Sequence, residues 1–324
     1  MGAVIKGYSL APENDTDLYY CIKGDQLCES IIADIMDQKK LEKELLSFQP
    51  DIIFHLAAQP LVRLSYDLPV ETFEINAIGT AHLLNAIRNL SIPCVTILIT
   101  TDKVYENKEW VYPYRETDRL GGLDPYSASK ACAEIIIHSF INSFFHLDKY
   151  AEHQKAFGVT RAGNVIGGGD WAKDRIIPDI VKALNNNEPV TVRNPYAIRP
   201  WQHVLEPLGG YLLLAKKIAE KPELFSGPWN FGPLAEDNLV VEDLVKKALE
   251  VWGSGSYVIP AIKNQPHEAG ILQLDINKAL SKLQWKPKWN SAIAIEKTLS
   301  WYKKAEQLSA GELIEKDIES YTSI

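Results

Sequence analysis

Short apolar runs alternate with longer amphipathic stretches along the first half of the chain. The apolar runs are rich in β-branched residues and end in small, polar or acidic residues, which is typical of buried parallel strands. The stretches between them have the length and apolar spacing of helices. We expect strands at residues 3–10, 31–35, 52–59 and 95–99, and helices at residues 39–48, 70–90 and 131–145. This alternation predicts an α/β fold with a doubly wound parallel sheet.

The pattern changes after a further strand expected at residues 156–161. Short segments and turns follow, and from Val240 onward the spacing is mostly helical. We expect helices at 176–185 and 207–219, strands at 190–195 and 229–233, a Pro-rich interruption at 259–268, and a polar tail at 306–324 that frays. The chain then divides into a sheet domain, residues 1–166 with 204–233 returning to it, and a smaller mixed α/β domain, residues 167–203 and 234–324.

Two stretches carry groups suited to acid–base chemistry. The stretch Thr100-Thr101-Asp102-Lys103 closes the strand at 95–99, and ligands bind outside the carboxyl ends of strands in such sheets. The sequence DPYSASK opens the next helix and places Tyr126 and Lys130 one turn apart on the same face. A lysine ammonium beside a phenol lowers the pKa of the phenol, so Tyr126 is a candidate general base. A surface helix could carry the same pair, but the preceding strand end favours catalysis.

The composition excludes several classes of protein. The 324 residues, 46% hydrophobic and 23% charged, are those of an ordinary globular protein, and a net charge of −8 argues against a nucleic-acid partner. The four cysteines lack C-x-x-C spacing, and the seven histidines form no H-x-x-x-H pair. No apolar run approaches the roughly 20 residues that span a bilayer, and the first ten residues are unlike a signal peptide. We expect a cytoplasmic protein with reduced thiols, no metal site and no membrane segment.

Two further motifs suggest ligand contacts. The triple glycine Gly167-Gly168-Gly169 could cradle a phosphate, but it lacks G-x-G-x-x-G spacing and a helix directly behind it. We therefore favour a flexible crossing between domains. The segment IRPWQHV brings Arg199, an aromatic residue and His203 together, which suits a diphosphate and a planar base. A structural cation–π contact would need the same residues.

With these residues in hand, the chain resembles the extended short-chain dehydrogenase/reductase family, and within it the dehydratases that act on CDP-glucose. The stretches that carry the resemblance are HLAAQPLVRLSY from His55, TDKVYENKEW from Thr101, DPYSASK from Asp124, RAGNVIGGGDWAKDR from Arg161 and IRPWQHVLEPLGGYLLLA from Ile198. The Tyr-x-x-x-Lys signature is generic to the superfamily. The combination of GGGDW and RPWQHV is far narrower and favours the dehydratases.

The resemblance implies NAD as cofactor and a nucleotide sugar, CDP-glucose, as substrate. C4 would be oxidised, water lost across C5 and C6, and hydride returned to C6, as a step of O-antigen sugar synthesis. The implied NAD contacts are Asp34, Ile35, Leu56, Ala57, Ala58, Thr100, Tyr126 and Lys130. The implied catalytic residues are Thr101, Asp102, Lys103, Tyr126 and Lys130. The implied contacts to the sugar nucleotide are Gln59, Asn164, Arg193, Arg199 and His203.

The sequence departs from the family pattern in two places. Related dTDP-sugar dehydratases have Asp-Glu where this chain has Asp102-Lys103. Asp102 would protonate the leaving hydroxyl, and Lys103 would take the C5 proton while neutral. The family's first strand and its Gly-rich G-x-x-G-x-x-G loop are also missing. The absent strand would lie between those at 3–10 and 52–56, so we expect the sheet to close up or the chain to be an N-terminally truncated piece.

Two other functions remain open. An NDP-sugar 4-epimerase would use Tyr126 and Lys130 and return hydride to C4, without need of Asp102. A chain without the phosphate loop could also be a non-catalytic remnant that binds sugar nucleotides or is inert.

The family implies a homodimer in which the helices at 70–90 and 131–145 form a four-helix bundle. The stripe Ile135, Ile136 and Phe140 fits this interface and fits a buried core face equally well.

Overall fold

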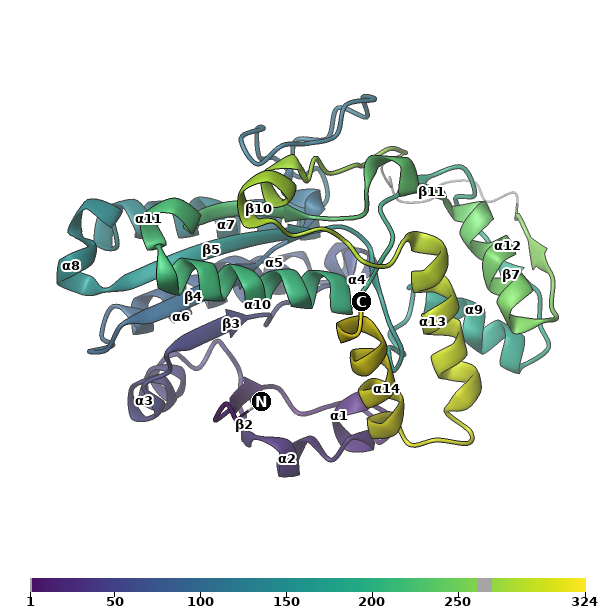
Figure 1. Ribbon diagram of the computed structural model, residues 1–324, viewed down its shortest axis with the longest axis horizontal. Helices are drawn as coiled ribbons and strands as arrows, with labels where there is room; N and C mark the ends of the chain where they lie inside the picture. The colour runs from purple at the N-terminus through teal and green to yellow at the C-terminus, as the bar shows by residue number, and fades with distance from the viewer. Residues whose placement is uncertain (1, 261–269) are drawn as a thin grey trace.

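Four parallel strands form the central sheet, in the order β10-β5-β4-β3. The computed structural model describes residues 2–260 and 270–324, and Figure 1 shows the sheet crossing the middle of the molecule. The strands are β3 (Ile52–His55), β4 (Cys94–Ile99), β5 (Lys155–Ala162) and β10 (Gly227–Phe231). β5 is buried along its whole length because both faces of the sheet are covered. The predicted parallel α/β sheet is confirmed, and the domain boundaries stay a prediction.

Helices cover both faces of this sheet. The helix predicted at 70–90 is a run of three segments, with a single π turn between two α-helices. The helices packed around the sheet are α3 (Gln38–Phe48), α4 (Val62–Asp67), α5 (Pro69–Phe73), η1 (Glu74–Ile78), α6 (Gly79–Ile87), α7 (Pro125–Phe144), α8 (Tyr150–His153), α10 (Leu205–Glu220) and α11 (Pro222–Phe225), with a 3₁₀ turn η3 (Leu147–Lys149) before α8. Among the described residues, no helix is both long and apolar enough to cross a membrane.

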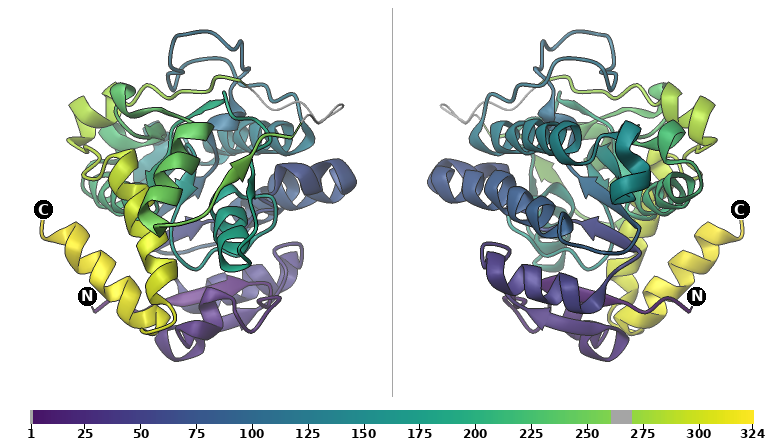
Figure 2. Two further views of the ribbon diagram at one scale, coloured as in Figure 1. Left: turned by 90° about the vertical axis from the view of Figure 1, so that its right-hand side faces the viewer. Right: turned by 90° about the vertical axis from the view of Figure 1, so that its left-hand side faces the viewer.

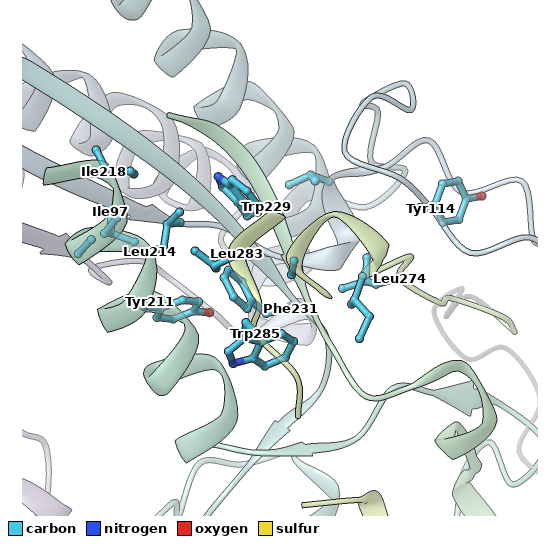
Figure 3. Packing of buried hydrophobic residues seen from close by; sticks show 14 of the residues in the cluster. Ile97, Tyr114, Tyr211, Leu214, Ile218, Trp229, Phe231, Leu274, Leu283 and Trp285 are labelled. Carbon is cyan, nitrogen blue, oxygen red and sulfur yellow. The ribbon is translucent and has the colours of Figure 1, made fainter. Parts of the chain in front are cut away.

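Alternate residues of β4 enter two different hydrophobic cores, one on each face of the sheet. Cys94 and Leu98 join the core formed with α3, α6 and α7. Ile97 joins the core formed with α10 and with aromatic residues of β10. Figure 3 shows Ile97 beside Leu214 and Ile218 of α10 in this second core. This alternation is why an uninterrupted apolar run, rather than an alternating one, marks a central strand.

Segments distant in sequence complete the second core. Trp285 packs edge-on against Phe231, with ring centroids 4.9 Å apart, and Figure 3 places both beside Tyr211. Trp285 follows the π turn η5 (Ala279–Leu283), so the C-terminal part of the chain covers one end of the sheet. Fully burying an aromatic residue stabilises a core by about 1.5–3 kcal/mol.

The first two strands form a separate sheet. β1 (Lys6–Ser9) pairs in parallel with β2 (Glu29–Ile32), and within the described residues neither strand pairs with β3. The expectation that the sheet closes up is therefore wrong. The physical reason is that α3 connects the two sheets through side chains, including an ion pair of 2.9 Å between Lys6 and Glu44. Figure 2 shows this N-terminal unit, with α1 (Leu18–Cys21) and α2 (Gly24–Leu27), as a layer beside the C-terminal helix.

The C-terminal part forms a third core between α9, α12 and α13. Its elements are β6 (Val165–Ile166), α9 (Ile176–Asn185), β7 (Val190–Thr191), β8 (Ile198–Arg199), β9 (Gln202–His203), η4 (Ala235–Asp237), β11 (Leu239–Val240), α12 (Val241–Trp252), β12 (Tyr257–Val258), α13 (Ser291–Lys304) and α14 (Ala310–Thr322). The predicted strand at 190–195 is only two residues long. Most of the predicted Pro-rich interruption lies outside the described residues.

The tail does not fray, contrary to the sequence expectation. It forms α14, whose first turn is closed by a capping box between Ser309 and Glu312. Leu313 and Tyr321 are buried on its inner face, and the Tyr321 hydroxyl donates to Glu206 at 2.9 Å. The polar residues that suggested fraying lie on the outer face of an amphipathic helix.

The triple glycine is a tightly packed crossing. A Cβ on Gly168 would lie 2.1 Å from the Trp301 ring, and one on Gly169 would lie 2.8 Å from Leu18. Gly169 also has φ +81°, which side chains rarely adopt. This packing agrees with the prediction that the triple glycine is a crossing between domains and not a phosphate loop. The predicted flexibility of the crossing is wrong, because its glycines are closely packed.

The substitution Gly168→Ala should lower the free energy of unfolding by about 1–3 kcal/mol, because the added methyl group overlaps the buried Trp301 ring. Urea denaturation followed by tryptophan fluorescence measures this change. Gly311→Ala is the matched control, since a Cβ at Gly311 meets nothing within 4 Å. Equal midpoints for Gly168→Ala and the parent would contradict the packing assigned to this crossing.

Candidate active site

The carboxyl end of β4 turns sharply and buries a carboxylate. The 3₁₀ turn η2 (Asp102–Val104) begins after Thr101, whose hydroxyl accepts from the Lys103 backbone N–H at 3.3 Å. The Asp102 side chain is fully buried, and its Oδ1 accepts from Thr101 Oγ1 at 2.9 Å. Lys103 Nζ lies 3.3 Å from the same oxygen. Asp102 Oδ2 is buried without a hydrogen-bond partner in the described part of the chain. A buried carboxylate oxygen left in this way is suited to bind a ligand hydroxyl.

The start of α7 places two more functional groups at this strand end. Asp124 caps the helix by accepting from the Ser127 backbone N–H at 2.9 Å, and Pro125 occupies the first helical position. The Tyr126 backbone N–H donates to Ser65 Oγ of α4 at 3.1 Å, which fixes the first turn. Tyr126 and Lys130 are then 8% and 7% exposed, so both polar groups lie inside the protein.

The expected lowering of the Tyr126 pKa by Lys130 is wrong for this structure. Burial raises the pKa of Tyr126 to about 12, and a hydrogen bond with Thr101 and the charge of Arg175 oppose that rise. Lys130 instead donates from Nζ to the Ile99 carbonyl at 3.3 Å. Burial also lowers the pKa of Lys130 to about 8, with the charge of Glu134 acting in the opposite direction. Tyr126 can therefore remove a proton only when a bound ligand lowers the pKa of its phenol.

The residues implied for NAD differ in exposure and come from several segments of the chain. Asp34 accepts from the Met36 backbone N–H at 2.9 Å in the exposed turn after β2, and Ile35 is buried beneath α6. After β3 come Leu56, 57% exposed, then Ala57, exposed, and Ala58, which is partly buried. Thr100 is buried, and its hydroxyl donates to Glu134 at 2.6 Å.

The residues at the nicotinamide end fit such a cofactor better than those at the pyrophosphate end. Lys130 keeps donors for a ligand, because its one hydrogen bond within the described residues is to Ile99. Tyr126 lies beside it at the carboxyl end of β4, where a ribose would be bound. The pyrophosphate needs backbone N–H donors, and the sequence has no G-x-x-G-x-x-G loop to supply them.

The predicted substrate residues divide into two groups. The Gln59 amide is used inside the protein, where it accepts from Leu61 N and donates to Thr72 Oγ1 at 2.9 Å. His203 is 2% exposed, accepts from the Leu205 backbone N–H at 3.3 Å, and packs edge-on against Trp289. The Gln59 amide positions the neighbouring chain, whereas His203 Nε2 is buried without a hydrogen-bond partner in the described part of the chain. The binding of both residues to substrate stays a prediction.

The other three predicted substrate residues differ in how they are paired. Asn164 Oδ1 is buried without a partner in the described part of the chain. Arg199 is 8% exposed, and its Nη1 donates to the Ile198 carbonyl at 2.9 Å. Arg193 binds Asp174 at 2.6 Å from the exposed side of the C-terminal part. The structure does not bring Arg193 and Arg199 into direct contact.

Sequence reasoning missed two arginines that belong to the same neighbourhood. Arg63 of α4 lies 3.6 Å from Asp174, so Asp174 joins it to Arg193. Arg175 is close enough to Tyr126 for its charge to lower the pKa of the phenol. The signal was available for Arg175, because it closes the GGGDWAKDR stretch that supports the resemblance. Arg63 also lies in a stretch that supports the resemblance, HLAAQPLVRLSY, but its spacing in the sequence does not relate it to Asp174.

The parallel sheet with Tyr126 and Lys130 at the end of β4 defines a Rossmann-like site of the dehydrogenase/reductase type. A family model described as GDP-mannose 4,6 dehydratase matches residues 17–298, and the chain belongs to this family.

The chain is 47% identical over 303 residues to CDP-glucose 4,6-dehydratase of Salmonella typhimurium, covering 94% of this chain and 84% of that protein. It is 28% identical over 269 residues to UDP-glucose 4-epimerase of Mycoplasma genitalium, covering 80% and 77% of the two chains. The crystal structure of dTDP-glucose 4,6-dehydratase from Bacillus anthracis in complex with NAD has a TM-score of 0.72 and 20% identity, over 94% of this chain and 89% of that one. The last similarity supports the fold.

A buried histidine at the end of β3 gives a pH-dependent prediction. His55 Nε2 lies 3.0 Å from Thr80 Oγ1, and burial lowers the pKa of His55 to about 3. The unfolded chain therefore binds this proton between pH 6.5 and about 3 while the folded chain does not. The free energy of unfolding should fall by about 1.4 kcal/mol per pH unit in this window through His55.

Denaturation with urea at pH 6.5, 5.5 and 4.5 measures this contribution when the parent is compared with His55→Asn. The variant should be less stable at pH 6.5 and should lose less stability on acidification. Parallel pH dependences for the two proteins would show that His55 is not held neutral.

Proposed function

We propose that this chain converts CDP-glucose to CDP-4-keto-6-deoxyglucose with NAD as cofactor. The observation that carries the proposal is the buried Asp102, paired with the partly exposed Lys103 beside Tyr126, with one oxygen of Asp102 left for a ligand. A carboxyl and an amine at one strand end can supply both proton transfers of an elimination. The likeness to the Salmonella dehydratase supports the same reaction.

NAD, when bound, supplies a hydride acceptor for C4 of the sugar and a hydride donor for C6. Tyr126 takes the proton of the C4 hydroxyl, and Lys130 holds positive charge beside it. Thr101 hydrogen-bonds to Tyr126 and lies next to Asp102, so its hydroxyl is placed to contact the C4 oxygen as well.

The elimination requires an acid and a base in adjacent positions. Neutral Lys103 removes the C5 proton, which the C4 ketone acidifies, and protonated Asp102 gives its proton to the departing C6 oxygen as water. A neutral amine and a carboxylic acid together carry as many protons as an ammonium and a carboxylate. The 3.3 Å between Lys103 Nζ and Asp102 Oδ1 therefore allows one proton transfer to produce both reactive forms.

Arginines are suited to hold the diphosphate of the substrate. Charge-assisted hydrogen bonds from guanidinium to phosphate are strong and directional. Arg63, Arg175 and Arg193 gather around Asp170 and Asp174 near the catalytic strand end, and we assign them this role together with Arg199.

The competing epimerase function would also use Tyr126 and Lys130. An epimerase loses no water and needs no acid for that step. The epimerase function therefore gives no role to the buried carboxyl group of Asp102. The product separates the two functions, because an epimer keeps oxygen at C6 and a dehydratase product does not. A non-catalytic remnant would form neither product.

The wild-type chain with CDP-glucose and NAD should yield a 4-keto-6-deoxy sugar nucleotide, identified by its C6 methyl signal in proton NMR. Lys103→Ala should reduce product formation at least 100-fold, since general base catalysis contributes about 10²–10⁴-fold. The variant should still exchange hydride at C4, measured as reduced cofactor absorbance under single-turnover conditions.

Lys108→Ala serves as the matched control, because Lys108 is a nearby, more exposed lysine paired with Glu106. It should retain full activity. Undiminished formation of the methyl product by Lys103→Ala would remove Lys103 from the mechanism, and a C4 epimer from the wild type would replace the dehydratase with the epimerase.

We further propose that the protein is a homodimer in the cytoplasm. A groove of about 420 Å³ on α5, η1 and α7 is lined almost entirely by apolar side chains: Val70, Phe73, Glu74, Ala77, Ile78, Cys132, Ile135 and Ile136. Val70 of α5 is 64% exposed and Ile135 of α7 is 60% exposed, so two helices expose large apolar side chains in the same groove. Two copies of this face would bury each other, and the free cysteines agree with a reducing compartment.

Ile135→Glu should convert the dimer to a monomer, because two carboxylates would be buried against each other across a twofold interface. Sedimentation velocity measures the change in mass. Leu224→Glu on α11 is the control, since Leu224 is also 60% exposed but lies away from the groove. A parent that sediments as a monomer would disprove this interface.

A further inference from the structure

A buried charged network lies directly behind Lys130 and has no part in the proposed reaction. Glu134 of α7 and Arg161 of β5 are 5% and 3% exposed. Arg161 Nε donates to Glu134 Oε1 at 2.8 Å and to Oε2 at 3.2 Å, and Nη2 also donates to Oε2. This bidentate ion pair therefore joins α7 to β5 of the sheet.

Both N–H groups of Arg161 Nη1 are paired as well. Nη1 donates to the Tyr105 hydroxyl at 2.8 Å and to the Glu116 carbonyl at 3.0 Å. The Tyr105 hydroxyl donates in turn to Asn230 Oδ1 at 2.7 Å. Glu134 is thus held in one position by a network that reaches from α7 through β5 to β10, and its carboxylate cannot swing away.

Glu134 also contacts the chain just before the catalytic turn. Thr100 Oγ1 donates to Glu134 Oε1 at 2.6 Å, and Thr100 directly precedes Thr101. Lys130 lies one helical turn before Glu134 and donates to the Ile99 carbonyl at 3.3 Å. One carboxylate therefore contacts the strand end that carries Thr101 and Asp102, and it lies one turn of α7 from Lys130.

The charges around Lys130 come from several elements. α7 supplies Tyr126 and Glu134, β3 supplies His55, and η2, which packs on α7, supplies Asp102 and Lys103. His55 is neutral because burial lowers its pKa to about 3. Asp102 is already paired with Lys103. Glu134 is the acidic group whose charge opposes the effect of burial on Lys130.

We propose that Glu134 is a positioning residue that acts through Lys130: it keeps the Lys130 side chain cationic beside Tyr126 and fixes the strand end through Thr100. This inference rests on the proposed function, because a cationic Lys130 is useful only where Tyr126 removes a proton. A purely structural ion pair would have the same hydrogen bonds but would leave the titration of Lys130 unchanged.

The test is a titration of Lys130 by NMR, with ¹³C-labelled lysine and the signal assigned by its loss in Lys130→Arg. In Glu134→Gln the midpoint should move down by about one pH unit, because removal of a nearby opposite charge disfavours the ammonium. The alkaline limb of the kcat profile should move down by the same amount. The amide oxygen keeps an acceptor for Thr100, while the amide NH2 replaces an oxygen that accepts from Arg161.

Glu206→Gln is the matched control. Glu206 is also a fully buried carboxylate, which accepts from Trp289 N at 2.7 Å and from the Tyr321 hydroxyl, and it belongs to a different core. Both variants should lower the melting temperature, but only Glu134→Gln should move the Lys130 midpoint.

A folded Glu134→Gln with an unchanged Lys130 midpoint would overturn the proposal. If that variant does not fold, Glu134→Gln combined with Arg161→Gln leaves no unpaired buried charge, and it should also show a lowered midpoint. The NMR measurement needs no substrate turnover, so a lowered midpoint in a chain without dehydratase activity would refute the proposed function and leave the effect of Glu134 on Lys130 intact.

Discussion

The end of β4 has to hold several charged side chains away from water, and the surrounding structure follows from this constraint. Asp102, Lys130, Glu134 and Arg161 are all at most 7% exposed. Unpaired charges in such positions are too costly for a domain whose net stability is roughly 5–15 kcal/mol. The fold meets the cost by pairing Glu134 with Arg161, Asp102 with Lys103, and Lys130 with the Ile99 carbonyl. The Glu134 and Lys130 contacts join α7 to β5 and β4, whereas Asp102 and Lys103 pair within η2, so α7 and the sheet must assemble together.

Much of the fold could be predicted because central parallel strands are buried on both faces. The runs at β4 and β5 are apolar without interruption, and α9 begins and ends at the predicted residues. Among the described residues β1 does not pair with β3, which agrees with the absent strand expected between them, but the sequence did not decide whether the sheet would close up. The C-terminal helix was also missed, because its polar outer face dominates the composition of the tail.

The positions of the candidate site residues could be predicted from the sequence, but their pKa values and hydrogen-bond partners could not. Tyr126, Lys130 and Asp102 lie on two segments whose positions follow from strand ends and helix spacing. The pKa of Tyr126 depends on burial by the whole fold, so the pair of residues alone gave the wrong direction. Gln59 and His203 lie in motifs typical of the family, yet the Gln59 amide is used inside the protein, and one ring nitrogen of His203 accepts from the backbone while Nε2 is left without a partner among the described residues. A motif indicates which residues are near a site, and only the hydrogen-bond partners separate contact from support.

The separate sheet of β1 and β2 has a consequence for the energetics of the molecule. A two-stranded unit joined to the rest through side chains has few backbone bonds to hold it, so it can open without unfolding the main sheet. Asp34 lies on this unit, whereas Tyr126 and Lys130 belong to the larger core. Amide hydrogens of β1 and β2 should accordingly exchange faster than those of β4 and β5, and the two ends of one extended ligand would be held by regions of unequal local stability.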